Sequence, residues 1–287
     1  MPACIAFNLK MSDATGVTLA ISIVVYFPDA LWLKATLETL VAALAHARHA
    51  GAVRSAKICL VDNQSASAIS PFSADLDRLC RELGWVKTIS VAGHGNIGYG
   101  RGNNLAIAHC IACDFHLVLN PDVKIADDAI TNALRFLQQH PACAMVSPVA
   151  TAPDGKALYL VKRFPELFTL LLRGFAPVWL KRRFRLRLDA YERKETPYDA
   201  GLGNVQIAGG CFMLIRRTAL EQTNGFDPAF FLYFEDFDLS YRIAKFSSIS
   251  RVPDVRIVHA GGNAAKKGWR HRWFFMRSAA RFYSKHR

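Results

Sequence analysis

The sequence lacks several patterns that would assign it at once to a class of protein. It has no paired cysteine motif of the kind that binds zinc. It also has no G-K-[ST] phosphate-binding loop and no G-x-G-x-x-G fingerprint after the first expected strand. No run approaches the roughly 18 apolar residues of a membrane span. These absences argue against zinc ribbons, P-loop enzymes and Rossmann dehydrogenases, and they favour a soluble or peripheral protein.

The cysteines and the N-terminus give little further direction. Cys110 and Cys113 have C-x-x-C spacing, but they lie in an apolar, helix-like segment that we expect to run through Ala112. Without a second pair or a flanking histidine, they are predicted to be buried thiols in a reducing cytoplasm. Residues 1–17 lack the charged and apolar regions of a signal peptide, so we expect a flexible leader, with Met11 as an alternative start.

Positive charge is concentrated in two stretches. The chain has 287 residues, 52% of them hydrophobic, which is enough for one large α/β domain with a substantial core. Of its net charge of +13, residues 156–195 contribute +7 and residues 264–287 contribute +8. The rest is therefore slightly negative. Nucleic acid and an anionic membrane surface are the two partners that such local basicity indicates.

Strand-like and helix-like segments alternate through the first half of the chain. Buried strands are predicted at residues 19–26, 57–62, 85–91 and 115–120, and helical periodicity follows each of them. This alternation predicts a doubly wound, mostly parallel sheet. Ligands of such sheets bind beyond the carboxyl ends of the strands, so the residues just after each strand are of most interest.

Polar residues and glycines collect at those positions. Asp62 and Asn63 end the second expected strand, the turn GHGNIGYGRGNN follows the third, and Asn120-Pro121-Asp122 follows the fourth. The turn either brings backbone close to a ligand such as a phosphate, or is an ordinary glycine-rich helix start. Asp122 can hold a hard cation that bridges diphosphate oxygens, or can simply close an Asx turn.

The second half carries a cluster of acids in an apolar setting. In FFLYFEDFDLSYRI, Glu235, Asp236 and Asp238 lie among large apolar residues before a helix-like run. Desolvation raises the pKa of a carboxyl group and makes it a better base. The other interpretation is a helix whose first turn is acidic because the macrodipole favours it.

Two other late segments bear on a site. Residues 205–217 read as a strand broken by Gly209 and Gly210, where backbone approaches something closely. A later strand ends at His259, which is either a structural histidine or a ligand of the same cation as Asp122. From Trp269 the chain is basic, aromatic and amphipathic, and we expect a C-terminal amphipathic helix there.

Six motifs in order carry a family resemblance. LVDNQS, GNIGYGRGNN, LNPDV, AGGCFMLIRR, YFEDFDLSYR and VHAGG closely resemble the family 2 glycosyltransferases of the GT-A fold, most of all the bacterial rhamnosyltransferase-like branch. The match runs from about Thr18 to the end of the sequence. It implies one continuous GT-A domain with a nucleotide-sugar-binding half (18–150), an acceptor-binding and catalytic half (151–265) and a basic amphipathic tail (266–287).

The resemblance implies donor contacts in the first half. Asp62 and Asn63 would contact the nucleotide base, while Asn96, Gly98 and Asn103 would line the nucleotide-sugar pocket. All five lie after the second or third expected strand.

The resemblance also implies a divalent cation, Mg or Mn. Asp122 matches the second acid of the family's D-x-D motif, which binds metal and diphosphate, and His259 matches a position where some relatives donate a ligand. Asn120 stands where the first acid of that motif is expected. This departure removes one negative charge from the nucleotide-sugar and metal site.

On the acceptor side the resemblance implies a catalytic base. Gly209 and Gly210 would floor this side of the site, Asp236 would be the base, and Glu235 would hold the acceptor. Asp238 is then expected to be a structural acid at the helix start.

The implied reaction is an inverting sugar transfer from a nucleoside diphosphate sugar, with dTDP-rhamnose favoured, to a glycan or lipid-linked acceptor. Cell-surface polysaccharide synthesis of the O-antigen type is the expected setting. Arg163, Lys181, Arg182 and Arg183, and residues 270–287, would bind an anionic membrane at the cytoplasmic face of the plasma membrane.

Two alternatives stay open. A sugar-phosphate nucleotidyltransferase calls for a basic, glycine-rich loop near the first strand, where VVYFPDALWL has neither glycine nor lysine. A nucleic-acid-binding protein fits the pI near 9.6. This interpretation does not explain the acids that lie among apolar residues, and the sequence has no recognisable nucleic-acid-binding motif. No specific nucleic acid is therefore expected.

Overall fold

A single mixed sheet forms the centre of the protein. The computed structural model describes residues 16–64, 71–261 and 268–286, so the expected leader lies almost wholly outside the described residues. The sheet has nine strands, eight of them in the order β3-β2-β1-β4-β10-β6-β11-β5, with β7 added beside β6. The strands are β1 (Val17–Val25), β2 (Val53–Asp62), β3 (Val86–Val91), β4 (Phe115–Leu119), β5 (Val123–Ile125), β6 (Cys143–Thr151), β7 (Ala157–Leu158), β10 (Phe212–Arg216) and β11 (Ser248–His259).

Strand directions confirm the predicted doubly wound, mostly parallel architecture. β1 runs parallel to β2 and β4, β2 to β3, and β6 to β11. β10 is inserted antiparallel between β4 and β6, and β5 is antiparallel to β11. A separate two-stranded sheet pairs β8 (Val161–Lys162) with β9 (Ile207–Ala208), so the strand predicted at residues 205–217 is indeed broken at the glycine pair.

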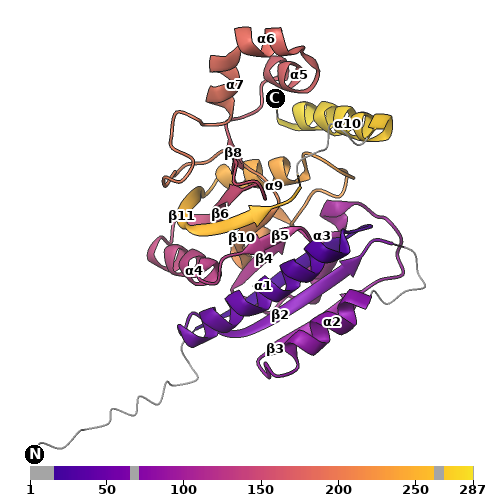
Figure 1. Cartoon of the computed structure of the whole chain (residues 1–287), viewed down its shortest axis with the longest axis vertical. Coiled ribbons are helices and arrows are strands. Elements are labelled where there is room, and N and C mark those ends of the chain that lie inside the picture. The colour runs from indigo at the N-terminus through magenta and orange to yellow at the C-terminus, as the bar shows by residue number, and fades with distance from the viewer. Residues whose placement is uncertain (1–15, 65–70, 262–267, 287) are drawn as a thin grey trace, which may run out of the picture.

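Helices cover both faces of the sheet (Figure 1). Alternate residues of β1 face opposite ways: Ile21 and Ile23 pack with α1, α2 and α4, whereas Ala20 and Val24 pack with α3. α8 and α9 join a second cluster on the face of α3. The helices are α1 (Ala30–His49), α2 (Pro71–Cys80), α3 (Tyr99–His109), α4 (Ala129–Gln139), α5 (Leu167–Phe175), α6 (Val178–Arg183), α7 (Arg185–Tyr191), α8 (Arg217–Thr223), α9 (Glu235–Ala244) and α10 (Gly268–His286).

The end of α3 corrects one expectation. The helix stops at His109 rather than running through Ala112, and Cys110 is its C-cap, with its N–H bonded to the Ile107 carbonyl. The chain must turn here because Asp114 N–H donates to the Thr18 carbonyl (2.9 Å) to start β4. Cys110 is buried as predicted, whereas Cys113 is only half-buried.

The basic segment at residues 266–287 contains the expected C-terminal helix, which packs against the rest of the protein. Its described part forms α10, which packs on α5, α7 and α9 at one end of the molecule (Figure 1). Phe282 of α10 is fully buried in a cluster with Phe230 and Phe234. None of the helices in the described ranges is long and apolar enough to cross a bilayer.

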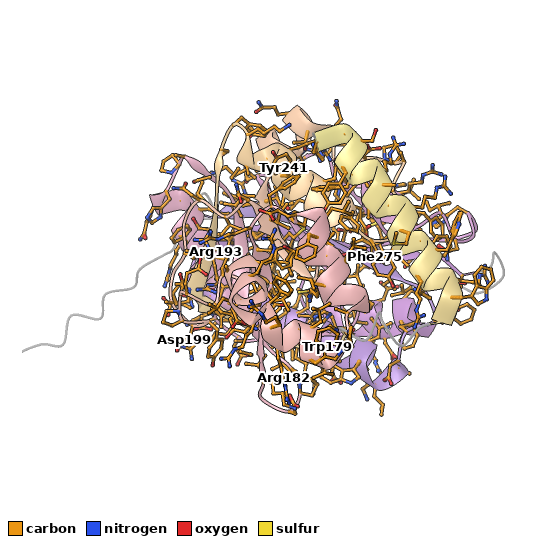
Figure 2. The ribbon with its side chains drawn as sticks, turned by 90° about the horizontal axis from the view of Figure 1, so that it is seen from above. Trp179, Arg182, Arg193, Asp199, Tyr241 and Phe275 are labelled. Carbon is orange, nitrogen blue, oxygen red and sulfur yellow. The ribbon has the colours of Figure 1, made fainter. Side chains whose placement is uncertain are left out.

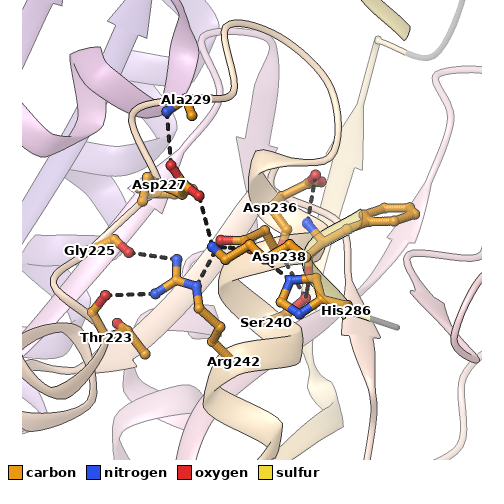
Figure 3. A network of polar contacts seen from close by, with 12 residues as sticks. Thr223, Gly225, Asp227, Ala229, Asp236, Asp238, Ser240, Arg242 and His286 are labelled. Carbon is orange, nitrogen blue, oxygen red and sulfur yellow. Dashed lines mark hydrogen bonds and ion pairs between the residues drawn. The ribbon is translucent and has the colours of Figure 1, made fainter. Parts of the chain in front are cut away.

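A buried ion-pair network holds α10 on α9 (Figure 3). Asp238 is fully buried, and Arg242 Nε donates to its Oδ2 (2.7 Å). Lys285 Nζ (2.7 Å) and His286 Nε2 (2.8 Å) reach its Oδ1 from α10. Asp238 is structural, as expected, but its partners lie in α10 as well as in its own helix. Breaking such a buried pair costs about 3–5 kcal/mol.

A strained turn leads into α9. Tyr233 and Phe234 have φ of +69° and +66°, a left-handed conformation that costs non-glycine residues about 1–3 kcal/mol each. α10 stabilises this turn, because Ser278 Oγ donates to the Leu232 carbonyl (2.9 Å) and His271 Nδ1 lies 2.9 Å from the Tyr233 hydroxyl. The orientation of the first residues of α9 therefore depends on α10.

Gly98 is the glycine with the least tolerance for a side chain. Its φ is +92°, and a Cβ atom there would lie 2.3 Å from the Phe231 carbonyl oxygen. Gly98→Ala should lower the free energy of unfolding by about 3–5 kcal/mol, combining backbone strain with overpacking. Gly93 (φ +90°, with no atom within 4 Å of a Cβ) is the matched control. Gly93→Ala should cost only about 1–2 kcal/mol. Equal losses in urea titrations of the two variants would contradict the clash.

Candidate active site

Two adjacent acids at the start of α9 have different surroundings. Glu235 is buried, and its Oε2 has no hydrogen-bond partner in the described part of the chain. Asp236 is half-buried and accepts two backbone N–H groups, that of Gly210 at Oδ2 (2.8 Å) and that of Phe237 at Oδ1 (2.9 Å). The glycine at position 210 is required, because a Cβ there would lie 2.9 Å from Asp236 Cβ.

The expected protonation states of Glu235 and Asp236 differ because their surroundings differ. Burial, together with the Asp236 charge, raises the pKa of Glu235 to about 8. Burial also raises the pKa of Asp236, but the Gly210 N–H and the Lys162 charge oppose the rise. We therefore expect Glu235 to hold a proton at neutral pH and Asp236 to be the ionised member, which suits it to act as a base.

Lys162 is a buried cation near this pair that sequence reasoning missed. It lies on β8, donates to the Tyr159 carbonyl (3.2 Å) and sits 5.6 Å from the Phe237 ring centroid. Burial, with the charge of Arg173, lowers its pKa to about 8. The sequence contains no indication of this role, because Lys162 lies in a two-residue strand within a stretch that has no clear periodicity.

Tyr99 joins the acids to the sheet rim, and it too was missed. Its hydroxyl lies 2.7 Å from Asn120 Oδ1 and 2.9 Å from the Gly210 carbonyl oxygen. Burial, with the charges of Glu235 and Asp236, raises the pKa of this phenol well above its ordinary value, so it remains a hydrogen-bond donor. The sequence did offer one signal for Tyr99, an aromatic residue directly after Gly98, where a helix was expected to begin.

Asp122 and His259 converge, as the cation interpretation requires. β5 pairs antiparallel with β11 so that His259 lies opposite Val123, and His259 Nε2 is 3.3 Å from Asp122 Oδ1. Burial alone would lower the pKa of His259, but Cys211 and Asp122 raise it to about 10. The sequence could not establish this contact, which depends on a register between segments far apart in the chain.

The turn that carries Asp122 is held from beneath by Thr36. This buried α1 residue donates to the Pro121 carbonyl (2.9 Å) and accepts the Val123 N–H (3.1 Å). Above the turn, a Cβ at Gly261 would lie 2.6 Å from Asp122 Oδ2 and 2.7 Å from His259 Nε2. The two side chains therefore face a space that only glycine leaves open.

This pair fits a divalent cation with few protein ligands. The Asp122 carboxylate suits Mg²⁺ or Mn²⁺, and the His259 imidazole can join it as a ligand when the cation displaces its proton. Within the described ranges there is no group of three or more His, Cys, Asp or Glu side chains that could hold a metal. Further ligands would have to come from phosphate oxygens and water.

A cavity of about 470 Å³ opens at the same rim. Asn63, Asn96 and Gly98 line it together with Tyr99, and its volume is typical of small-molecule sites. These residues support one another: Asn63 Nδ2 donates to the Gly98 carbonyl (3.2 Å), and Asn96 Oδ1 accepts the Gly98 N–H (3.1 Å). The structure thus brings three of the predicted nucleotide-sugar residues together.

Three other predicted residues are not part of the cavity lining. Asn103 is fully buried and is bonded to Ser22 (2.6 Å) and to the Tyr99 carbonyl (3.1 Å), so it supports the cavity wall rather than lining it. Asp62 is buried beside Asn63 and accepts the Gln64 N–H (2.9 Å). Gly209 donates to the Leu160 carbonyl, beside the small sheet.

Curated relatives are rhamnosyltransferases. N-acetylglucosaminyl-diphospho-decaprenol L-rhamnosyltransferase of Mycobacterium tuberculosis is 29% identical over 182 residues, which cover 57% of this chain and 56% of that protein. Rhamnosyltransferase WbbL of Escherichia coli is 26% identical over 194 residues, covering 64% and 67%. The chain thus spans little more than half the length of the first relative. No protein-family model matches it.

Solved structures establish the fold. The mannosyltransferase PcManGT of Pyrobaculum calidifontis, in complex with GDP-Man and Mn²⁺, superposes with a TM-score of 0.55 at 17% identity, covering 91% of this chain and 61% of that one. GalNAc-T7, with UDP, GalNAc and Mn²⁺, gives 0.57 at 14%, covering 85% and 43%. The chain has the GT-A fold, and its curated relatives are rhamnosyltransferases of the kind that the six motifs indicated. The resemblance carried by the six motifs is confirmed.

In this GT-A protein the acid pair should make stability depend on pH. The folded-state pKa of Glu235 lies above its ordinary 4.5, so its stabilising contribution is complete below pH 4.5 and is lost as pH rises toward 8. Glu235→Gln should therefore gain stability over the wild type across this window, by at least about 1 kcal/mol at pH 8. Thermal unfolding at several pH values measures the difference. Glu221→Gln, which removes a more exposed acid of α8 that pairs with Arg217, is the control for loss of a carboxylate. Parallel pH profiles for Glu235→Gln and wild type would contradict the buried, protonated state.

Proposed function

We propose that this protein transfers a sugar from a nucleoside diphosphate sugar to a hydroxyl group of a glycan or lipid-linked acceptor in cell-surface polysaccharide synthesis. The observation that carries the proposal is a chain of hydrogen bonds that connects the cavity, the sheet rim and the acid Asp236. The cavity wall residue Tyr99 bonds to Asn120 and Gly210, and Gly210 bonds to the half-buried acid Asp236. A nucleoside-sized cavity, a diphosphate-binding rim and a general base are what such a transfer requires.

The relatives support a choice of sugar. Those of Mycobacterium tuberculosis and Escherichia coli are both named rhamnosyltransferases. We therefore propose L-rhamnose, delivered from dTDP-rhamnose. The first of them acts on a diphospho-decaprenol-linked sugar by its name, which supports a lipid-linked acceptor here.

Asp236 serves as the base in the proposed mechanism. It removes the proton of the acceptor hydroxyl while that oxygen bonds to the anomeric carbon and the bond to the diphosphate breaks. Attack from the face opposite the leaving group inverts the configuration, and no covalent enzyme intermediate forms. The Gly210 and Phe237 N–H groups fix the orientation of the carboxylate. Glu235, beside it and protonated, is available to donate to the acceptor.

Asp122 and His259 would hold a divalent cation, Mg or Mn, and such a cation neutralises charge on a departing diphosphate. Both solved relatives reported above carry Mn²⁺, which supports this choice. Asn120 keeps its side-chain oxygen on the Tyr99 hydroxyl, so it contributes geometry rather than the negative charge of an acid.

Asp236→Asn should abolish transfer while leaving donor binding within about twofold of wild type. The amide keeps an oxygen for the Gly210 N–H but is not a base, so a loss of at least about 10²–10⁴-fold in kcat is expected. Product formation from dTDP-rhamnose and a lipid-linked acceptor, with calorimetry of dTDP, measures both quantities. Asp75→Asn, at an exposed acid of α2, should retain full activity. Near-normal turnover by Asp236→Asn would contradict the assignment of Asp236 as the general base.

One end of the molecule has the character of a membrane-binding face, supporting a peripheral, cytoplasmic location. α5–α7 and α10 lie there together, although the 76 residues 192–267 separate them in the sequence (Figures 1 and 2). Trp179, beside Arg182 in Figure 2, is 69% exposed. Large exposed apolar side chains are interspersed with the basic ones: Leu167, Phe168, Leu171, Val178, Trp179 and Leu186.

Some of the basic residues predicted for this face are occupied elsewhere. Arg163 is paired with Glu195 (2.9 Å), and Lys285 is paired with Asp227 and Asp238. Lys181, Arg182 and Arg183 in the last turn of α6 are therefore the better candidates for lipid phosphates.

Replacing Lys181, Arg182 and Arg183 by glutamine should weaken binding to anionic vesicles at least about tenfold, since each basic residue near a membrane contributes about 1 kcal/mol. Co-sedimentation with phosphatidylglycerol and phosphatidylcholine vesicles measures it. Replacing Arg78, Arg81 and Lys87, near α2 and β3 at the other end of the molecule, removes the same charge and should have little effect. Binding that ignores anionic lipid would remove the membrane proposal.

A further inference from the structure

The cavity at the sheet rim is walled partly by α10. Trp269, Arg270, His271 and Phe274 line it, opposite residues from β1, the end of β2 and the start of α3. None of these four was predicted to belong to a binding pocket. The helix that the sequence presented as a membrane-binding tail thus contributes a wall to the cavity that holds the predicted nucleotide-sugar residues.

The beginning of α10 is held in place at this wall. His271 Nδ1 lies 2.9 Å from the Tyr233 hydroxyl, and the Phe274 ring lies 4.9 Å from the Phe231 ring. The turn that carries Phe231 also contacts α3, because Tyr99 N–H donates to the Phe231 carbonyl (3.1 Å). The position of Trp269 relative to the predicted donor residues is therefore set by direct contacts within one turn of the helix.

Two exposed aromatic side chains face this cavity from different elements. Tyr26, directly after β1, is 53% exposed, and Trp269 is 77% exposed. Phe282, further along α10, is instead used for packing and has no exposed surface. Large aromatic surfaces left open around a cavity suit a planar ligand, because stacking on them is favourable for any nucleobase.

We propose that α10 completes the donor pocket: Trp269 and Tyr26 cover the base of a nucleoside diphosphate, and Arg270 binds its diphosphate. This inference rests on the proposed function, since it concerns the same donor. It makes α10 a substrate-binding element that is joined to the catalytic helix α9 through Asp238. Arg270 brings a permanent positive charge to the cavity lining, and guanidinium groups bind phosphate oxygens with two hydrogen bonds.

The test compares two tryptophans of the same helix. Trp273 is also exposed (52%), lies about one turn further along α10 and is outside the cavity lining. In calorimetric titrations with dTDP and Mn²⁺, Trp269→Ala should raise Kd by about 5- to 100-fold, the range expected for loss of a base-stacking partner. Trp273→Ala should leave Kd within about twofold. Unchanged thermal unfolding of both variants establishes that each is folded.

A second pair tests the diphosphate contact. Arg270→Gln should reduce the preference for dTDP over thymidine at least about fivefold, because only the diphosphate interacts with the guanidinium. Arg272→Gln, two residues on and outside the cavity lining, should leave that preference unchanged.

Each outcome bears on one proposal or both. Failure of the wild-type protein to bind dTDP, UDP, GDP or ADP overturns the proposed function and this inference with it. Wild-type binding that Trp269→Ala leaves intact overturns this inference alone. Equal losses of vesicle binding in Trp269→Ala and Trp273→Ala, with normal dTDP affinity in both, would also overturn it, because both tryptophans would then serve the membrane.

Discussion

The hydroxyl group of Tyr99 is the contact on which the site depends. It lies between Asn120, two residues before Asp122, and Gly210, whose N–H group orients Asp236. Three segments that are far apart in the sequence therefore meet at one buried phenol, which stays protonated because burial and the neighbouring acids oppose its ionisation. The spacing between the nucleotide side and the acid side of the site follows from this single donor and its two acceptors.

The acid pair illustrates how environment separates two similar side chains. Glu235 and Asp236 are adjacent and both lose solvent, yet only Asp236 receives two backbone N–H groups and the opposing charge of Lys162. One proton on Glu235 then relieves the repulsion that two buried charges would create. Neither Lys162 nor the Gly210 contact lies near the acids in sequence, so the composition of the EDFD segment could indicate a perturbed pair without indicating which member is ionised.

Much of the fold and part of the site could be predicted from the sequence, because both depend on local patterns. Alternating periodicity located the buried strands. The rule that ligands bind beyond the carboxyl ends of parallel strands directed attention to Asn63, Asn96 and Asp122. The predictions that failed concern residues whose positions depend on long-range contacts. Asn103 resembles its neighbours in the glycine-rich turn, but the helix that begins at Tyr99 directs it inward to Ser22. The amphipathic pattern of α10 could not show that this helix packs on the protein, because its attachment depends on the buried Asp238 of α9.

The attachment of α10 also has a consequence for the order in which the protein matures. The strands β1 to β4 all end by Leu119, so they can pair before the rest of the sheet is synthesised. The strained turn at Tyr233 and Phe234 and the wall formed by Trp269 need residues as late as Ser278 and His286. A nascent chain on the ribosome therefore has its nucleotide-side sheet long before it has a closed cavity. The cavity is therefore complete only after α10 has been synthesised and has packed on α9.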